Sequence, residues 1–427
     1  MELQLKNIGM IKEANVKIDG LTVIAGENDT GKSTVGKVVF CIIKAISRYE
    51  EDFQESKYYK VGVILERLFF YLRRNINLDD DLYIEIKNIL DINYFEKMLN
   101  NNKTEEYIDK IKNYVSNINN QTFNSRLIEE RLLQLENIIK LPEDKQSSIE
   151  SALNKVFRSE FNSDILTHGC ENGFIKLYEN SLLLLDIVIH KNNKIELKNE
   201  VEPIEIKEAT FIETPLILNN HDLLIRSQTG LELTKRSSRR LGIPYTTLHT
   251  KDLFDKLKSE NFDLSFDNEF ECEIREEISN IINGEIVYDD DEKDFIYIKN
   301  GNKVAIKNTA TGIKAFGIIQ LLIENGFIDR TSLLILDEPE IHLHPKWQLQ
   351  YAQIITTLVK YDIPVMVTSH SPYMIQALIK YAKNSNISDK SNFYLIDKDD
   401  ELAESKNVNN SINEIFELLA KPMNEIY

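Results

Sequence analysis

The sequence predicts an α/β protein in which helices cover a mainly parallel sheet and a helical segment interrupts the chain. Three observations lead to this prediction. Strand-like and helical patterns alternate from Asn308 onward, a glycine-rich loop joins an apolar strand to a helix at residues 26–34, and residues 48–160 carry apolar side chains at helical spacing. Strands that alternate with helices imply a parallel sheet with helices on both faces.

The N-terminal part of the chain predicts the first strands of this sheet. Apolar residues alternate with polar ones over residues 3–18, as in half-buried strands. Residues 48–160 then change in composition, because they are rich in Asn, Lys, Glu and Leu and contain almost no Gly or Pro. We interpret them as a helical insertion into one discontinuous domain, formed by residues 1–47 and 161–427.

The later elements follow from the same patterns. Strands return at residues 174–185 and 195–211, and the stretch EIVYDDDEKDFIYI (285–298) predicts a hairpin with an acidic tip. The acidic run 289–294 could bind a cation, but a solvated hairpin tip is the simpler interpretation. The last part predicts helices in TGIKAFGIIQLLIEN, PKWQLQYAQIITTLVK and PYMIQALIKYA, and strands in SLLILD, PVMVTS and FYLI.

The composition indicates a water-soluble globular protein. The chain has 427 residues, of which 42% are hydrophobic and 28% are charged, and no apolar run is long enough to cross a membrane. The N-terminus lacks a secretory pattern and the three cysteines are scattered, so we expect a cytoplasmic protein that makes no membrane contact. The net charge of −18 argues against a protein that coats nucleic acid with its whole surface.

The densest basic stretch, LTKRSSRRLG, leaves two interpretations open. It contains Lys235, Arg236, Arg239 and Arg240. Most charge runs are solvated loops. Alternatively, these cations contact nucleic acid, a nucleotide phosphate or an acidic partner.

The stretch GENDTGKST, residues 26–34, has the residue types of a phosphate-binding loop. It satisfies the pattern G-x-x-x-x-G-K-[ST] between an apolar strand and a helix, a context that argues against a turn without a ligand. In such a loop the backbone N–H groups and the helix N-terminus face the phosphates, Lys32 reaches the β- and γ-phosphates, and the Ser33 hydroxyl ligates Mg²⁺. The residues expected to contact ATP are Gly26, Glu27, Asn28, Asp29, Thr30, Gly31, Lys32, Ser33 and Thr34.

Two adjacent acids follow the apolar strand SLLIL. Asp337 and Glu338 would lie at the carboxyl end of a buried strand, the edge where ligands bind in open α/β sheets. Because an unpaired buried carboxylate is costly, acids at this edge predict a metal or a bound substrate. Asp337 is then the Mg²⁺ partner, and Glu338 orients and deprotonates the attacking water. The alternative is that both acids only cap the following helix.

A histidine follows the strand PVMVTS, which we expect beside the strand that bears Asp337. The imidazole of His370 would then face the same crevice and contact the γ-phosphate or the attacking water. A helix-capping His–Ser pair is the alternative. The predicted catalytic residues are therefore Lys32, Glu338 and His370.

The order of GENDTGKST, ILDEPEIHLHP and VTSHSP resembles the ABC-type ATPases of the OLD and SMC-like group, common in bacterial repair and anti-phage systems. At the level of motifs the resemblance covers roughly residues 1–45 and 305–375. It implies a P-loop NTPase with an ABC-type ATPase head and the cofactors ATP and Mg²⁺. It also implies that Asp337 and Glu338 are the Walker B pair, that His370 is the switch histidine and that HLHP occupies the D-loop position.

The same resemblance implies a signature motif that caps ATP held by an opposite subunit. The candidate is NTATGIK, residues 308–314, at the start of a predicted helix. The family pattern prefers Ser, then Ser or Gly, before the glycine, whereas this chain has Ala310, Thr311 and Gly312, so the first hydroxyl is missing. We expect Thr311, Gly312 and Lys314 of a second subunit to complete the site.

The resemblance implies an Mg-dependent ATPase whose heads dimerise on ATP and switch an effector. OLD-family nucleases carry a nuclease domain after the ATPase, and we expect the segment 371–427 to be too short for one. The chain more closely resembles stand-alone ATPase subunits of anti-phage systems such as Septu and PARIS. This resemblance implies a homodimer or higher homo-oligomer and a separate effector protein, either a nuclease or a toxin.

Two other functions stay open at this stage. One is an SMC- or recombination-type DNA-repair ATPase that acts directly on DNA, for which neutralising Arg236, Arg239 and Arg240 would weaken salt-dependent DNA binding. The other is a scaffold that binds ATP with little turnover, for which Glu338→Gln would leave turnover unchanged.

Overall fold

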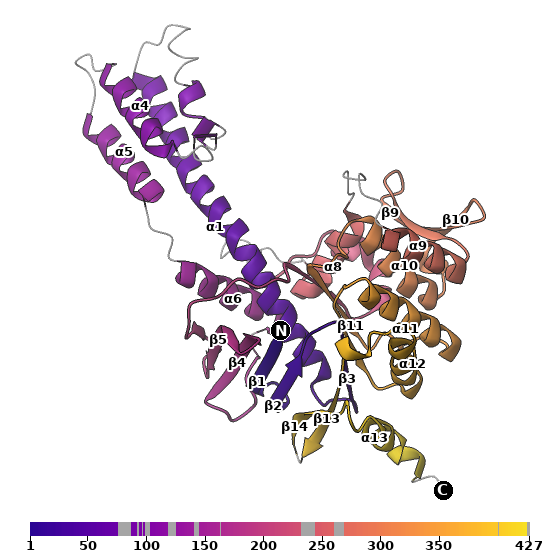
Figure 1. The fold of residues 1–427 in the computed structure, drawn as a ribbon. Coiled ribbons are helices and arrows are strands. Elements are labelled where there is room, and N and C mark those ends of the chain that lie inside the picture. Colours follow the sequence, from indigo (N-terminus) through magenta and orange to yellow (C-terminus); the bar gives the residue numbers. More distant parts are fainter. Residues whose placement is uncertain are drawn as a thin grey trace. The chain divides into compact units, whose positions relative to one another are not determined.

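The computed structural model of the protein describes most of the chain (Figure 1). The described residues are 1–75, 87–91, 94–95, 97–98, 103–117, 125–140, 145–162, 164–231, 244–259, 269–399 and 401–424. The basic stretch LTKRSSRRLG (233–242), with Lys235, Arg236, Arg239 and Arg240, lies entirely outside the described residues.

The chain divides into two compact units. One unit comprises Met1–Ser47 and Ile149–Tyr427, and the other comprises Arg48–Ser148. The second unit thus ends near residue 148, whereas the sequence analysis places the end of the helical insertion at residue 160.

The described residues of the first unit form one sheet of eleven strands, in the order β6-β5-β4-β1-β2-β14-β13-β3-β12-β11-β7. The last five strands of this order are parallel to one another, and the register places Asp337 opposite Thr368 and Leu336 opposite Ile212. These pairings put β12 directly beside β11, as the sequence predicts. The five strands are β13 (Ser391–Asp399), β3 (Leu21–Gly26), β12 (Val365–Ser369), β11 (Ser332–Asp337) and β7 (Glu208–Ile212).

The strands β3, β12 and β11 are buried along their whole length, as expected of parallel strands covered on both faces. Leu334 and Leu336 belong to the core on one face of β11. On the other face, a Cβ added to Gly36 of α1 would lie 3.0 Å from Ile335 Cγ2. Helices therefore cover both faces, and the predicted α/β fold class is confirmed.

The remaining strands extend the sheet with mostly antiparallel pairs. β1 pairs with β2 and β4, β5 pairs with β4 and β6, and β14 connects the two halves because it pairs with both β13 and β2. The bounds are β1 (Glu2–Ile8), β2 (Ile11–Lys17), β4 (Asn172–Glu179), β5 (Leu182–His190), β6 (Ile195–Leu197) and β14 (Leu402–Asn407).

The same unit contains a small antiparallel sheet, β10-β9-β8. β8 (Glu285–Asp289) pairs with β9 (Asp294–Lys299), which pairs with β10 (Asn302–Ala305). The acidic run therefore lies at a hairpin tip, as predicted. Among the described residues, no group of three or more His, Cys, Asp or Glu side chains is arranged to hold a metal ion.

The helices begin where the sequence provides caps or breaks the strand pattern. Ser371 caps the helix that follows β12, since its Oγ accepts a hydrogen bond from the backbone N–H of Met374, and Pro372 occupies the first helical position. The helices are α1 (Lys32–Asn75), α4 (Thr104–Asn117), α5 (Ser125–Lys140), α6 (Lys145–Phe161), α7 (His221–Leu224), α8 (Leu248–Lys258), α9 (Glu269–Ile282), α10 (Thr311–Glu324), α11 (Pro345–Lys360), α12 (Pro372–Asn384) and α13 (Asn413–Asn424). Short 3₁₀ helices cover Pro215–Asn220, Ile306–Asn308 and Ser388–Lys390.

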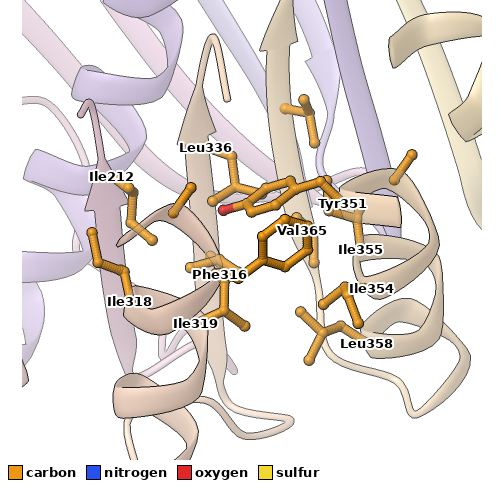
Figure 2. Packing of buried hydrophobic residues seen from close by; sticks show 14 of the residues in the cluster. Ile212, Phe316, Ile318, Ile319, Leu336, Tyr351, Ile354, Ile355, Leu358 and Val365 are labelled. Atoms are coloured by element: carbon orange, nitrogen blue, oxygen red, sulfur yellow. The ribbon is translucent and has the colours of Figure 1, made fainter. Parts of the chain in front are cut away.

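The main hydrophobic core packs α10 and α11 against the parallel strands (Figure 2). Phe316 of α10 is fully buried and meets the ring of Tyr351 of α11 edge to face, with ring centroids 5.1 Å apart. Figure 2 shows both rings beside Leu336 and Val365 of the sheet. A fully buried side chain of this kind contributes roughly 1.5–3 kcal/mol, so this packing fixes the strands whose ends carry the polar residues described below.

The second unit has a hydrophobic core of its own. It joins buried residues of α1, α4 and α5 with the segment around Leu90. Tyr107 of α4 is fully buried, and its hydroxyl donates a hydrogen bond to the carbonyl oxygen of Ile89 (2.9 Å). None of the helices described in either unit is long and apolar enough to cross a membrane.

Candidate active site

Polar segments follow the carboxyl ends of four neighbouring parallel strands. The loop at residues 27–31 follows β3, His370 follows β12, Glu338 follows β11 and Glu213 follows β7. Because these strands are parallel, the four segments meet at one edge of the sheet, where α/β proteins bind ligands.

The loop after β3 has the tight backbone of a phosphate-binding loop. Asp29 and Gly31 adopt positive φ angles of 63° and 87°. A Cβ on Gly31 would lie 2.9 Å from Ile11 Cγ1, and a Cβ on Gly26 would lie 2.4 Å from the carbonyl oxygen of Ile396. Both glycines are therefore required by close packing, and Gly31 is also required by its φ.

The exposed tip of the loop is formed by Glu27, Asn28 and Asp29. Thr30 Oγ1 donates a hydrogen bond to the carbonyl oxygen of Glu27 (2.9 Å), which closes the turn. Asp29 Oδ2 pairs with Nζ of Lys398 from β13 (2.7 Å), so a neighbouring strand also holds the tip.

Lys32, Ser33 and Thr34 open α1 directly behind the loop. The Lys32 side chain is only 3% exposed, and its Nζ donates to the carbonyl oxygen of Glu27 at 2.6 Å. Its ammonium therefore points into the loop, the position from which a lysine can neutralise a phosphate bound there.

Ser33 and Asp337 bring the two predicted motifs into direct contact. Asp337 is 7% exposed, and its Oδ1 accepts hydrogen bonds from Ser33 Oγ (2.9 Å) and Thr368 Oγ1 (2.5 Å). Burial raises the pKa of Asp337 above its ordinary value, and the two hydroxyl donors oppose this rise. A buried carboxylate of this kind is stabilised in its charged form by a cation.

Glu338 lies between two other predicted catalytic groups. Its Oε1 is 3.5 Å from Lys32 Nζ and 3.3 Å from His370 Nδ1. Its backbone adopts a φ of 48°, unusual for a residue other than glycine, and its N–H donates to both the carbonyl oxygen and Oγ1 of Thr368 (3.1 Å each). Strained backbone of this type is frequent at functional sites.

Glu213 is a further acid at this edge that the sequence analysis did not identify. Its Oε2 lies 3.1 Å from His249 Nε2, and its Oε1 lies 3.5 Å from Lys37 Nζ. The hydrogen bond with His249 lowers the pKa of Glu213 to about 2. The sequence contains a signal for Glu213, because this acid follows the strand ATFI directly, just as Asp337 follows SLLIL.

The buried histidine that contacts Glu213 also contacts a second glutamate. His249 Nδ1 lies 2.6 Å from Oε1 of Glu160 in α6, and neither side chain is more than 2% exposed. Burial alone would lower the pKa of His249, but hydrogen bonds with Glu160 and Glu213 outweigh it and raise the pKa. Because its partners come from α6, α8 and the end of β7, local sequence patterns do not predict this cluster.

The predicted signature residues lie at the start of α10. Among the described residues, Thr311, Gly312 and Lys314 make no hydrogen bond or ion pair with the loop at 26–34. Gly312 and Lys314 are buried, and burial lowers the pKa of the Lys314 amine. Lys314 is 2% exposed, whereas Thr311 is partly exposed. The contact of Lys314 with a nucleotide on a second subunit stays a prediction.

The residues of the site fit a magnesium–nucleotide complex. Mg²⁺ is usually held by one or two protein oxygens together with substrate phosphates. Ser33 Oγ and Asp337 Oδ1, 2.9 Å apart, are such oxygens, and the loop at 26–34 supplies the phosphate cradle beside them. When bound, Mg²⁺ neutralises charge on the transferring phosphoryl group.

Comparison with known proteins gives the family. A family model described as an AAA ATPase domain matches residues 1–375. The chain belongs to this AAA ATPase family. The match includes the loop at 26–34, Asp337, Glu338 and His370. The chain is therefore a P-loop ATPase, and this edge of the sheet is its candidate ATPase site.

Two curated proteins are similar to this AAA ATPase. Septu protein PtuA of Bacillus thuringiensis is 31% identical over 130 residues, 29% of this chain and 26% of PtuA. Endonuclease GajA of Bacillus cereus (strain HuB5-5) is 23% identical over 401 residues, 88% of this chain and 55% of GajA. The chain therefore spans about a quarter of the first relative and about half of the second.

Among solved structures, two SMC heads are similar to the AAA ATPase at low identity. The SMC head bound to the C-winged helix domain of ScpA gives a TM-score of 0.40 at 10% identity, over 97% of this chain and 98% of that chain. The SMC head domain from Thermotoga maritima gives 0.38 at 10% identity, over 95% and 98%. The fold assignment rests on the strand order and the loop described above.

Proposed function

We propose that this ATPase is a nucleotide-driven switch in a bacterial anti-phage defence system, in which ATP closes two heads and the closed state controls a separate effector protein. One observation carries the proposal for the chemistry. Glu338 Oε1 lies within 3.5 Å of both Lys32 Nζ and His370 Nδ1, beside the Ser33–Asp337 pair.

Each side chain then has a role that its surroundings support. Lys32 binds the β- and γ-phosphates, and Ser33 and Asp337 hold the metal ion of the substrate. Glu338 orients the attacking water and accepts its proton, while His370 contacts the γ-phosphate. Catalysis consists mainly of positioning and of stabilising the charge that develops on the phosphoryl group.

The proposal for the switch is supported by the exposure of two side chains. The His370 side chain is 39% exposed, so a second copy could reach this side chain. Of Thr311, Gly312 and Lys314, Thr311 is the residue that is partly exposed and can make this contact. We infer a homodimer or a higher homo-oligomer.

The proposal for the biological setting rests on relatives. Septu protein PtuA is a similar protein, and the motifs resemble stand-alone ATPase subunits of anti-phage systems. We therefore infer a cytoplasmic ATPase whose effector is a nuclease or a toxin on another chain. The helical unit Arg48–Ser148, which has its own core, is the surface we assign to that effector or to DNA.

The test is the solution mass of Glu338→Gln, measured by light scattering with and without Mg-ATP. This variant keeps the size of the side chain and removes the base, so ATP should stay bound without turnover. We expect a nucleotide-dependent doubling of mass, lost in Lys32→Ala. A mass that stays monomeric while nucleotide is bound would overturn the switch and favour a scaffold.

A further inference from the structure

The motif DEPE contains a second buried glutamate that the proposed chemistry does not use. Glu340 follows Glu338 by two residues, and its side chain is 4% exposed. A carboxylate in such a place is costly unless it is hydrogen-bonded. Its partners therefore indicate what it does.

One oxygen of Glu340 collects three donors from the segment that bears the switch histidine. Its Oε1 accepts from Ser369 Oγ (2.7 Å), from the backbone N–H of His370 (2.9 Å) and from the backbone N–H of Ser371 (3.1 Å). These N–H groups lie at the start of α12, where the helix dipole also favours a negative charge. The carboxylate thus fixes the backbone of residues 369–371.

Hydrogen bonds continue from this segment to the predicted D-loop. Ser371 Oγ donates to Gln348 Oε1 (2.7 Å), and Gln348 Nε2 donates to the carbonyl oxygen of Leu343 (3.0 Å). Ser371 and Gln348 are both 8% exposed, so these bonds are shielded from water. The segment that follows Glu338 is therefore tied to the segment of His370 at two points.

The imidazole ring of His370 lies beside two carboxylates. His370 Nδ1 lies 3.3 Å from Glu338 Oε1 and 3.6 Å from Glu340 Oε1. Within the described part of the chain, His370 Nδ1 and Glu340 Oε2 are both buried atoms without a hydrogen-bond partner. The position of the ring is thus set by its backbone and by these two carboxylates.

We propose that Glu340 is a positioning residue for ATP hydrolysis. Glu340 places His370 against Glu338, and it links the position of His370 to the position of the segment that contains Leu343. This inference rests on the role proposed for His370. Among the described residues, Glu340 makes no hydrogen bond or ion pair with the loop at 26–34. It therefore acts on the turnover step and leaves nucleotide binding to Lys32 and Ser33.

The test compares Glu340→Ala and Glu340→Gln, each with and without His370→Ala. Glu340→Gln keeps an acceptor oxygen at the same place, whereas Glu340→Ala removes the acceptor. We expect Glu340→Ala to lower kcat by about 10-fold or more with KM for ATP changed by less than about 3-fold, and Glu340→Gln to lower kcat by less. Asp389→Asn, at an exposed acid, is the matched control and should leave both constants unchanged.

The double variant separates positioning from a general loss of structure. If Glu340 acts through His370, adding Glu340→Ala to His370→Ala should lower single-turnover hydrolysis by less than about 2-fold. The imidazole NMR signals of His370, identified by their loss in His370→Ala, should move in Glu340→Ala and stay in place in Asp389→Asn.

Two results overturn the inference, and they differ from failure of the proposed function. Glu340→Ala with an unchanged kcat, or with an equal loss in the presence and absence of His370, excludes a positioning role. If His370→Ala alone leaves kcat unchanged, the role proposed for His370 is wrong. If Glu340→Ala does not fold, Glu340→Gln and the NMR signals still decide, because a kcat loss that is equal with and without His370 contradicts the inference.

Discussion

The hydroxyl of Ser33 donates a hydrogen bond to Asp337 Oδ1 over 2.9 Å, although the two residues are 304 positions apart. Asp337 ends β11, whereas Ser33 follows β3, and β12 lies between these two strands in the sheet. The contact forms because Ser33 belongs to the first turn of α1. This turn follows the loop at 27–31 and lies at the carboxyl edge of the sheet. This edge combines three motifs in one site.

Ser33→Ala should raise the Mg²⁺ concentration that ATP hydrolysis requires, with little effect on the stability of the fold. The change removes one hard oxygen ligand and one of the two donors that keep the pKa of Asp337 from rising further. We expect the Mg²⁺ concentration for half-maximal ATP hydrolysis to increase by about 10-fold, on the order of a lost hydrogen bond to a charged group. Ser33→Thr, which keeps the hydroxyl, is the control, and an equal response in both variants would contradict the assignment.

Lys32→Ala should abolish tight nucleotide binding. Its ammonium is buried in the loop, and a hydrogen bond to a charged group contributes roughly 1.5–3 kcal/mol, equivalent to about 10- to 100-fold in Kd. Isothermal titration with ATP measures the effect. Lys191→Ala, at an exposed lysine paired with Glu171, should leave the Kd unchanged. A small loss for Lys32→Ala would mean that the loop does not bind the β- and γ-phosphates.

The sequence predicts the residues of this site that lie within local patterns. Lys32, Ser33 and Asp337 lie where a strand ends and a loop or helix begins, which composition and spacing reveal. Thr368 and Glu340 could not be assigned, because their roles depend on which strand lies beside which. The pairing of β12 with β11 brings Thr368 to Asp337 and joins Glu340 to residues 369–371.

The helix α10 gives a second example of what local sequence patterns do not predict. The start of α10 was predicted correctly, and Thr311 is its first residue. The burial of Lys314 was not predicted, because amphipathic spacing does not reveal that α8, α9 and the small sheet cover α10 on further sides. For the same reason the cluster of Glu160, His249 and Glu213 was not foreseen.

The stability of the head should depend on pH through His249. Its pKa is raised above the ordinary value of 6.5, so the stability it contributes is complete below pH 6.5 and is lost as pH rises through the higher folded pKa. The charged groups that act on it are Glu160, Glu213 and Lys37. The free energy of unfolding should therefore fall from pH 6 to pH 9 more in the wild type than in His249→Gln.

Denaturant unfolding at several pH values measures this difference. At pH 6, His249→Gln should lose about 2–3 kcal/mol, because it breaks charged hydrogen bonds in a buried place. Glu213 acts at the other end of the scale, since its pKa of about 2 means that its contribution is lost between about pH 4.5 and 2. His168→Gln, at an exposed histidine, is the control. A parallel pH profile in wild type and His249→Gln would show that His249 is not charged in the fold.

Gly312→Ala should lower the stability of the fold, because Gly312 packs against Trp347 at the start of α10. A Cβ at this position would lie 2.1 Å from Trp347 Cε3, so the ring must shift. Overpacking of this kind costs about 1–3 kcal/mol, which thermal or denaturant unfolding detects. Trp347→Leu removes the obstacle, and the double variant should therefore be more stable than the sum of the two single losses by about 1 kcal/mol.

The ATPase activity of the same three variants then decides the role of Gly312. If the glycine serves packing alone, the double variant should hydrolyse ATP at the rate of Trp347→Leu. If its backbone also meets a nucleotide held by a second subunit, the added methyl keeps the rate low even though stability has returned. In that case the loss should grow with protein concentration relative to Trp347→Leu, because only the dimer uses the contact.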